Sequence, residues 1–314
     1  MNRKINLFWY RHTEGHGNFG DELNHYILSR ISPLAIKHID PHSFSDSFWI
    51  ASKTIFYKIF FIKGSIKNIF YFPEWNTVFG RKIVFAIGSI ISYYTTKNVI
   101  VWGSGLISLQ DNIGDADFRA VRGKYTQMRI QELDYNKPLV LGDPALLLPL
   151  IYTPARSAEF SIGIIPHYVH YQRLRCLYKD KRIKVINLLG PIEDVINDIN
   201  SCKFTISTSL HGIIVSHSYG IRSLWVDFPE IAKTFLDGDN IKFADYFSSV
   251  DIPEVEVFKI VNTTDLFEGK NNSIDKLFEK SVCPKSTKIT EIQIDLLRVA
   301  PFKLKEEFRV KTLE

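Results

Sequence analysis

The sequence predicts an α/β protein with two parallel-sheet domains that face a cleft. Short runs of β-branched and aromatic residues alternate with segments of helical period, which is typical of βαβ units rather than of sandwiches or bundles. The length, 314 residues, suits about two domains of roughly 150 residues each. With 45 % apolar and 23 % charged residues, the composition is globular and excludes disordered, collagen-like and coiled-coil chains.

The first domain is expected over residues 1–152. Ile5–Tyr10 has the composition of a strand, and the segment Asp21–Ile31 has an apolar face and an acidic first turn, which predicts a helix. Further strands are predicted at 84–87, 99–102, 120–121 and 139–141. Asp143 and Pro144 follow the last one as the N-cap and first residue of another helix.

The second domain is expected over residues 153–288. The segment Leu150–Glu159 has no periodicity and contains a proline, so we place the domain boundary there. Strands are predicted at 161–165, 184–188, 204–207 and 223–226. The remaining tail, 289–314, has helical period from Ile289 to Val310, and we expect it to pack back across the first domain.

Charge and cysteine content limit the function further. The net charge of +5 is too small for a nucleic-acid coat, so we expect no nucleic-acid partner, but it suits a site that holds an anion. Three widely spaced cysteines form neither a disulfide framework nor a zinc knuckle, which favours a reducing, cytoplasmic setting. We expect neither a signal peptide nor the roughly 20 apolar residues of a membrane-spanning helix.

The loop after the first strand has glycines in a G-x-G-x-x-G pattern. The residues concerned are Gly15, Gly17 and Gly20, with Asp40 farther along. This pattern matches a dinucleotide-binding fingerprint, but Arg11–Glu14 separate it from the strand, and a simple glycine-rich turn explains it equally well. In a third interpretation, Asn18, Gly20 and Asp21 offer an amide and a carboxylate at a helix N-terminus to a polyhydroxyl ligand.

A second candidate site is the turn 207–212, between a predicted strand and an apolar helix. It places hydroxyls, backbone N–H groups and the imidazole of His211 at the carboxyl end of a parallel strand, where open α/β sheets bind ligands. Alternatively, Ser209 only caps the helix and His211 bonds to a buried carbonyl. His217, inside the helix, is expected to pack in the core.

Two other strand ends carry candidate side chains. His167 follows a buried strand and a proline, which brings it to the same sheet edge as His211. Arg122 follows a strand of the first domain. It forms either a surface salt bridge or a bidentate contact with a ligand carboxylate or phosphate from across the cleft.

The order of seven short motifs resembles that of the polysaccharide pyruvyl transferase family. The motifs are Asn-Phe-Gly-Asp at 18–21, Trp-Gly-Ser-Gly at 102–105, Val-Arg-Gly at 121–123, Gly-Asp-Pro-Ala-Leu-Leu-Leu-Pro at 142–149, Gly-Ile-Ile-Pro-His-Tyr at 163–168, Ser-Leu-His-Gly at 209–212 and Lys-Phe-Ala-Asp-Tyr at 242–246. Together they span most of the chain, and the pair Gly-Asp-Pro-Ala and Ser-Leu-His-Gly is hard to obtain by chance.

The resemblance implies two Rossmann-like domains, similar to GT-B glycosyltransferases, and transfer of pyruvate from phosphoenolpyruvate to a sugar as a cyclic ketal. Such enzymes serve the biosynthesis of bacterial surface polysaccharides, as in capsule and exopolysaccharide. The reaction needs an acid for the methylene carbon, with cations and helix-end amides for the anionic donor. We therefore expect no cofactor besides the co-substrate phosphoenolpyruvate, and no metal.

Under this hypothesis His211 is the leading acid or phosphate ligand and His167 the second candidate, because histidine releases a proton near neutral pH. Asp21 orients or deprotonates a sugar hydroxyl, unless it is only a helix N-terminal acid. The expected donor-binding residues are Arg122, Ser209, Leu210, His211, Gly212 and Lys242. The expected acceptor-binding residues are Asn18, Gly20 and Asp21.

The acceptor and the location in the cell are less well defined. Residues 41–76 match no motif, and Phe48–Lys63 suits either an amphipathic surface on anionic lipid or a buried interdomain helix. Because the family's acceptors are often lipid-linked, we expect a lipid-linked oligosaccharide acceptor and peripheral contact with the inner face of the membrane. The competing functions are a GT-B glycosyltransferase that uses a nucleotide sugar and a non-catalytic carbohydrate-binding scaffold.

Overall fold

The computed structural model of the chain describes residues 4–11, 17–39, 82–92, 95–154, 157–230, 240–253, 255–260 and 272–312. Some predictions lie outside these residues. They concern Gly15 and Asp40 of the glycine pattern, and residues 41–76 with the segment Phe48–Lys63.

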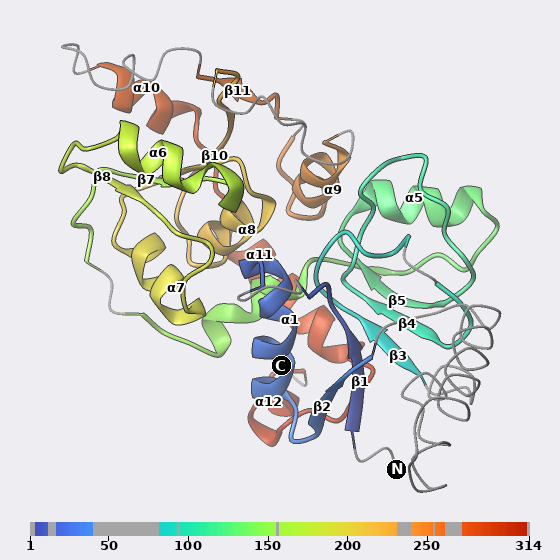
Figure 1. Ribbon diagram of the computed structural model, residues 1–314. Coiled ribbons are helices and arrows are strands. Elements are labelled where there is room, and N and C mark those ends of the chain that lie inside the picture. The colour runs from blue at the N-terminus through green and yellow to red at the C-terminus, as the bar shows by residue number, and fades with distance from the viewer. Residues whose placement is uncertain are drawn as a thin grey trace, which may run out of the picture.

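The first domain is built on a six-stranded parallel sheet (Figure 1). Its strands are β1 (Lys4–Phe8), β2 (Ala35–His38), β3 (Ile83–Phe85), β4 (Val99–Trp102), β5 (Asp117–Val121) and β6 (Val140–Leu141). Helix α1 (Phe19–Ile31) lies between β1 and β2 in the chain, and α5 (Lys124–Glu132) between β5 and β6. The strand order β2-β1-β3-β4-β5-β6 means that the winding reverses between β1 and β3. At such a reversal the loops diverge and leave a crevice at the carboxyl ends of the strands.

The second domain has a five-stranded parallel sheet with the same winding. Its strands are β7 (Ile162–Ile165), β8 (Ile183–Val185), β9 (Thr205–Ser207), β10 (Ser223–Asp227) and β11 (Phe258–Lys259). Its helices are η2 (Tyr168–His170), α6 (Tyr171–Leu177), α7 (Ile192–Asn200), α8 (Leu210–Ser218), α9 (Ile241–Ser249) and α10 (Asn272–Lys280). The order β11-β10-β9-β7-β8 places the reversal between β7 and β9. The two sheets confirm the predicted α/β class and are consistent with two Rossmann-like domains.

In the structure, some elements begin a few residues before their predicted positions. Helix α1 begins at Phe19 rather than Asp21, because the Asn18 carbonyl accepts hydrogen bonds from the N–H groups of Asp21 (2.9 Å) and Glu22 (3.0 Å). Strand β5 begins at Asp117, three residues before the predicted start. In its first half, polar residues alternate with an apolar one, and only its last two residues are apolar and buried. The apolar residues therefore predicted only the buried end of the strand.

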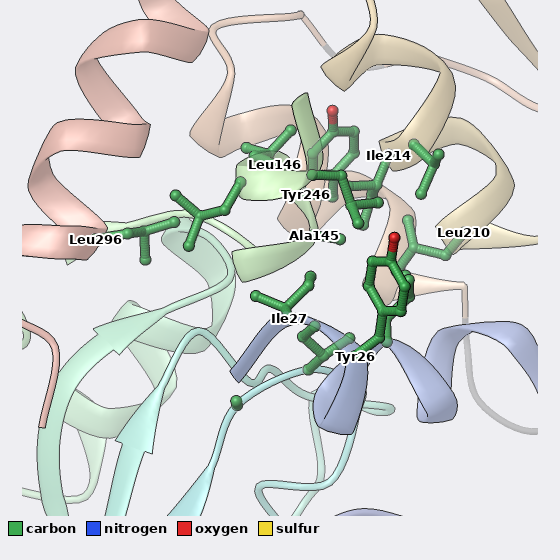
Figure 2. Close-up of a cluster of buried hydrophobic side chains, with 14 of the residues drawn as sticks. Tyr26, Ile27, Ala145, Leu146, Leu210, Ile214, Tyr246 and Leu296 are labelled. Atoms are coloured by element: carbon green, nitrogen blue, oxygen red, sulfur yellow. The ribbon is translucent and has the colours of Figure 1, made fainter. Parts of the chain in front are cut away.

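The segment between the domains begins as the short 3₁₀ helix η1 (Pro144–Leu150). Asp143 caps it by accepting the N–H of Ala145, and Pro144 takes the first position, as the sequence predicts. Helix η1 packs against α1, α8 and α11 (Ser286–Arg298). Figure 2 shows the cluster that joins them: Ile27 from α1, Ala145 and Leu146 from η1, Leu210 and Ile214 from α8, and Leu296 from α11.

The C-terminal helices α11 and α12 (Glu306–Val310) follow the second domain in the chain but contact the first. The Trp102 indole N–H donates to the Leu296 carbonyl at 2.9 Å. The Lys305 N–H donates to the Ile31 carbonyl at 2.9 Å. Among the helices in the described part of the chain, none combines the length and apolar character needed to cross a bilayer.

Candidate active site

Most of the predicted site residues lie at the two winding reversals, in the loops that follow the strands or in the first turns of the next helices. In the first domain β1 leads to Asn18–Asp21. In the second, β7 leads to His167 and β9 to Ser209–Gly212. Contacts between α1 and α7 bring the two domains together here, because the Tyr26 hydroxyl and the Arg30 guanidinium both bond to the Glu193 carboxylate, at 2.9 and 3.0 Å.

Gly20 and His211 meet across the domain junction. Gly20 lies in the first turn of α1, and a Cβ atom there would come within 2.0 Å of the imidazole Nδ1 of His211. Any larger residue would displace the imidazole. The glycine is therefore explained by close approach of this ring, an explanation that does not require a bound dinucleotide.

Asp143 lies on the other side of the same imidazole. Its side chain is fully buried, and Oδ1 accepts the Ala145 N–H at 2.9 Å. Its second oxygen, Oδ2, lies 3.7 Å from Nε2 of His211, which is longer than a hydrogen bond. Among the described residues, neither of these two buried atoms has a hydrogen-bond partner. Since the His211 side chain is 14 % exposed, the pair combines an accessible imidazole with a carboxylate held behind it.

Hydrogen bonds of Ser207 hold the turn before α8 in place. The Ser207 hydroxyl accepts the Ser209 N–H at 3.0 Å and donates to the Ile165 carbonyl at 3.0 Å. Gly212 packs so closely on β7 that a Cβ there would lie 2.7 Å from a carbon of Ile165. The first N–H groups of a helix have no partner within the helix, so this turn presents backbone donors and the positive end of the α8 dipole beside His211.

His167 is tied to the same edge through its backbone. Its N–H donates to the Thr208 hydroxyl at 2.8 Å, which joins the ends of β7 and β9. Its ring lies 4.5 Å from that of Tyr168, between centroids. His170, one turn later, is buried, and this burial lowers its pKa. The structure thus places His167 at the sheet edge that the sequence predicts.

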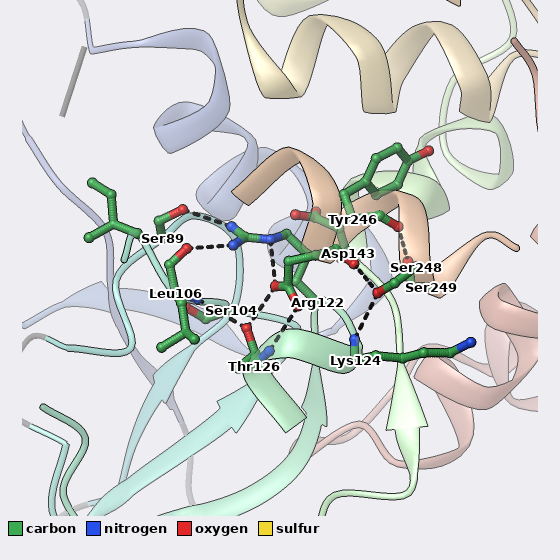
Figure 3. Close-up of polar contacts among 12 residues, drawn as sticks. Ser89, Ser104, Leu106, Arg122, Lys124, Thr126, Asp143, Tyr246, Ser248 and Ser249 are labelled. Carbon is green, nitrogen blue, oxygen red and sulfur yellow. Dashed lines mark hydrogen bonds and ion pairs between the residues drawn. The ribbon is translucent and has the colours of Figure 1, made fainter. Parts of the chain in front are cut away.

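Arg122 has different partners from those expected of a donor-binding residue. Its side chain, labelled in Figure 3, is fully buried, and its Nε lies 3.1 Å from the Asp245 carboxylate of α9. Its other nitrogens donate to the Ser89 hydroxyl at 2.7 Å and the Leu106 carbonyl at 2.5 Å. Thr126 completes the cluster by donating both its N–H and its hydroxyl to Asp245. In this arrangement the guanidinium joins the two domains and exposes no surface to a ligand.

The other predicted residues surround the junction. Asn18 is the N-cap of α1 and uses its carbonyl rather than its side chain, and Asp21 is half-buried in the first turn. Lys242 lies in the first turn of α9, where its Nζ is 5.7 Å from the centroid of the Phe243 ring. Phe243 in turn stacks on Trp225 at 4.3 Å.

Sequence reasoning missed two acidic residues. It assigned Asp143 only a capping role, although the Gly-Asp-Pro-Ala motif was the available signal. It noted Asp245 within Lys-Phe-Ala-Asp-Tyr without giving it a role. Both contacts are made between segments distant in the chain, so neither has a periodic signature. Among the residues described, no three His, Cys, Asp or Glu side chains are grouped as a metal would require.

Comparisons with known proteins agree with the motif order. The model of the polysaccharide pyruvyl transferase family matches residues 18–228, which include the first turn of α1, the winding reversal of the second domain and the turn with His211. An uncharacterized protein of Acanthamoeba polyphaga mimivirus is 32 % identical over 235 residues, covering 71 % of this chain and 80 % of that protein. No solved structure matches.

Proposed function

We propose that this chain, which belongs to the polysaccharide pyruvyl transferase family, transfers pyruvate from phosphoenolpyruvate to two hydroxyls of a sugar as a cyclic ketal. The observation that carries the proposal is the contact of His211 with Gly20 and Asp143 at the domain junction. An imidazole beside the N-termini of α1 and α8 can serve as the proton donor that this chemistry requires.

The reaction needs one proton donor, and phosphate is its leaving group. A proton adds to the methylene carbon of phosphoenolpyruvate, and the first sugar oxygen bonds to the central carbon as its own proton departs. The second sugar oxygen then bonds to the same carbon as the carbon–oxygen bond to phosphate breaks. Of the two protons lost by the sugar, one balances the proton placed on carbon and the other leaves with phosphate.

His211 is the acid in this scheme. Its imidazole delivers the proton to the methylene carbon, and Asp143 acts as a positioning residue that holds the ring from behind. The backbone donors of Ser209–Gly212, together with His167 and Lys242, hold the phosphate and carboxylate of the donor. Arg122 acts indirectly, since its pair with Asp245 sets the spacing between the domains.

The sugar binds from the side of the first domain. Asn18 and Asp21 offer an amide and a carboxylate at the start of α1, and Gly20 leaves the space that the imidazole needs. Asp21 orients or deprotonates a hydroxyl there. We further propose that the acceptor is a lipid-linked oligosaccharide of surface polysaccharide synthesis, which would place the chain at the inner face of the membrane.

The decisive experiment is incubation with phosphoenolpyruvate and a panel of glycosides. We expect phosphate release that depends on the glycoside, together with a product whose mass has increased by that of a pyruvate ketal. Release of a nucleotide from a nucleotide sugar, with no use of phosphoenolpyruvate, would instead identify a glycosyltransferase. Binding of glycosides without turnover of either donor would identify a carbohydrate-binding scaffold.

A further inference from the structure

A second site is suggested at the opposite edge of the first sheet from His211. A hollow of about 740 Å³ lies at the amino ends of β1, β3 and β4, beneath the segment 300–303 that links α11 to α12. This volume is within the range of pockets that hold small organic ligands, roughly 300–1,000 Å³. We call it the basic hollow. Its lining residues are Lys4, Ile5, Asn6, Leu34, Lys82, Val84, Ile100, Arg119, Ala300, Pro301, Phe302 and Lys303.

The floor of the basic hollow is apolar and held in place by other contacts. Ile5, Val84 and Ile100 are buried strand residues that form part of it. The covering segment is anchored on both sides. The Ser32 hydroxyl donates to the Lys303 carbonyl at 2.7 Å, and the Phe302 ring packs edge-on against Trp102 with 5.2 Å between centroids. The walls therefore exist without a ligand.

The rim carries four cations and no acidic residue among those that line it. Arg119 pairs with Asp117 at 3.2 Å, and Lys82 donates to the Lys97 carbonyl at 2.7 Å. Within the described residues, Lys4, Lys82 and Lys303 have no acidic partner. Three uncompensated ammonium groups around one hollow repel each other, and a multiply charged anion would relieve that repulsion.

We propose that the basic hollow binds an amphipathic phosphate ester, with its phosphate at the lysine rim and its apolar body on the floor. A ligand that matched only the apolar floor or only the lysine rim would leave the other part of the hollow without a partner. A purely ionic ligand would leave the apolar floor uncovered, and a neutral apolar ligand would leave the lysines unpaired. Because the lining lies at the amino ends of the strands, the ligand would not compete with substrates at His211.

The probe is dihexanoyl phosphatidic acid, used below its micelle concentration and titrated into the whole chain by calorimetry. We expect one molecule to bind, at least about tenfold more tightly than inorganic phosphate or dihexanoyl phosphatidylcholine. Inorganic phosphate tests the charge alone, and the phosphatidylcholine tests the apolar part with a neutral head. If either bound as tightly as the phosphatidic acid, the proposal would be overturned.

A charge-reversed variant locates the site. Lys4→Glu combined with Lys303→Glu should weaken binding of the phosphatidic acid by about tenfold or more. The control combines Lys179→Glu with Lys276→Glu, two exposed lysines of the second domain with the same change in charge, and should bind like the wild type. Equal affinity for all three proteins would place the ligand elsewhere and refute the proposal. The assay does not use pyruvyl transfer, so its outcome is independent of the proposed function.

Vesicles then identify the source of the ligand. Sedimentation of the wild type, but not of the rim variant, with vesicles that contain phosphatidic acid would assign the site to a bilayer lipid. Binding of the short-chain lipid without sedimentation would assign it to a soluble phosphorylated amphiphile. Both results retain the proposed chemistry, whereas sedimentation of both proteins to the same extent, with no short-chain binding, would contradict it.

Discussion

The two halves of the domain junction differ in how completely their buried polar groups are hydrogen-bonded. Where α9 meets α5, Arg122 and Asp245 are fully buried, and the four hydrogen bonds that Asp245 and Arg122 make with Thr126, Ser89 and Leu106 surround their ion pair. Where α1, α8 and η1 meet, His211 and Asp143 face each other at 3.7 Å, and each has a buried atom without a hydrogen-bond partner among the described residues.

We infer from this difference that the buried polar groups where α9 meets α5 are structural, and that those where α1, α8 and η1 meet are reactive. A saturated buried network fixes the orientation of what it joins and leaves little for a ligand to bind. A buried polar group without a partner costs free energy, so its retention in a folded protein calls for an explanation, and a role in chemistry is one. We infer that the α5–α9 half holds the domains at the spacing that lets the α1–α8 half work.

Replacing His211 should give the largest effect. In His211→Asn the side chain keeps an N–H donor but loses the imidazole that acts as the acid in the proposed mechanism. We expect glycoside-dependent phosphate release to fall by about 10²–10⁴, which corresponds to about 3–5 kcal/mol in the barrier. A steady-state phosphate assay measures the effect, with His25→Asn, an exposed residue of α1, as the matched control.

The folded state of His211→Asn must be shown separately. Its unfolding midpoint in urea should stay close to that of the wild type, because the imidazole makes no strong hydrogen bond in the described structure. Full activity in a folded His211→Asn variant would remove His211 from the mechanism.

Removing the ion pair between Arg122 and Asp245 should instead lower the stability of the fold. Arg122→Met leaves the Asp245 carboxylate buried without its cation, and such losses are typically about 3–5 kcal/mol. Urea unfolding followed by circular dichroism measures the change. The double variant Arg122→Met with Asp245→Leu removes the orphaned charge and should recover part of the loss. A single variant as stable as the wild type would show that this pair does not hold the domains together.

Asp143→Asn tests whether the carboxylate positions the imidazole. Asparagine can still cap η1, so stability should change little, while the rate should fall by about 10- to 100-fold. The split between kcat and KM provides the specific readout. A residue that holds the imidazole in position should affect kcat and leave the KM for phosphoenolpyruvate nearly unchanged. A loss of stability in parallel with the rate would indicate a packing role alone.

The sequence predicted local features of this junction better than its long-range contacts. The strands and the turn at Ser209–Gly212 depend on neighbouring residues, so periodicity and turn chemistry revealed them. Arg122 was assigned to a substrate because a guanidinium at a strand end looks the same whether its carboxylate comes from a ligand or from Asp245. Asp143 looked like a cap, which it is, but its contact with His211 depends on how two domains dock.

Two histidines of the same helix offer the last test of this contrast. His217 follows His211 on α8 and is buried with both ring nitrogens bonded, to the Tyr246 hydroxyl and the Val282 carbonyl, each at 3.0 Å. Burial lowers the pKa of His217 to about 3, from an ordinary value of 6.5. Below pH 6.5 the unfolded chain therefore binds a proton that the folded chain does not, and stability falls as the pH falls toward 3.

Between about pH 7.5 and pH 5, this group alone should cost about 2 kcal/mol of unfolding free energy. His217→Gln keeps side-chain hydrogen-bonding groups but cannot titrate, so its stability should vary less with pH by that amount. Urea unfolding of both proteins at the two pH values cancels the contribution of every other group. If the two proteins lost the same stability on acidification, His217 would not be the buried neutral base that its surroundings indicate. The contrast between the two imidazoles of α8 would then have to rest on His211 alone.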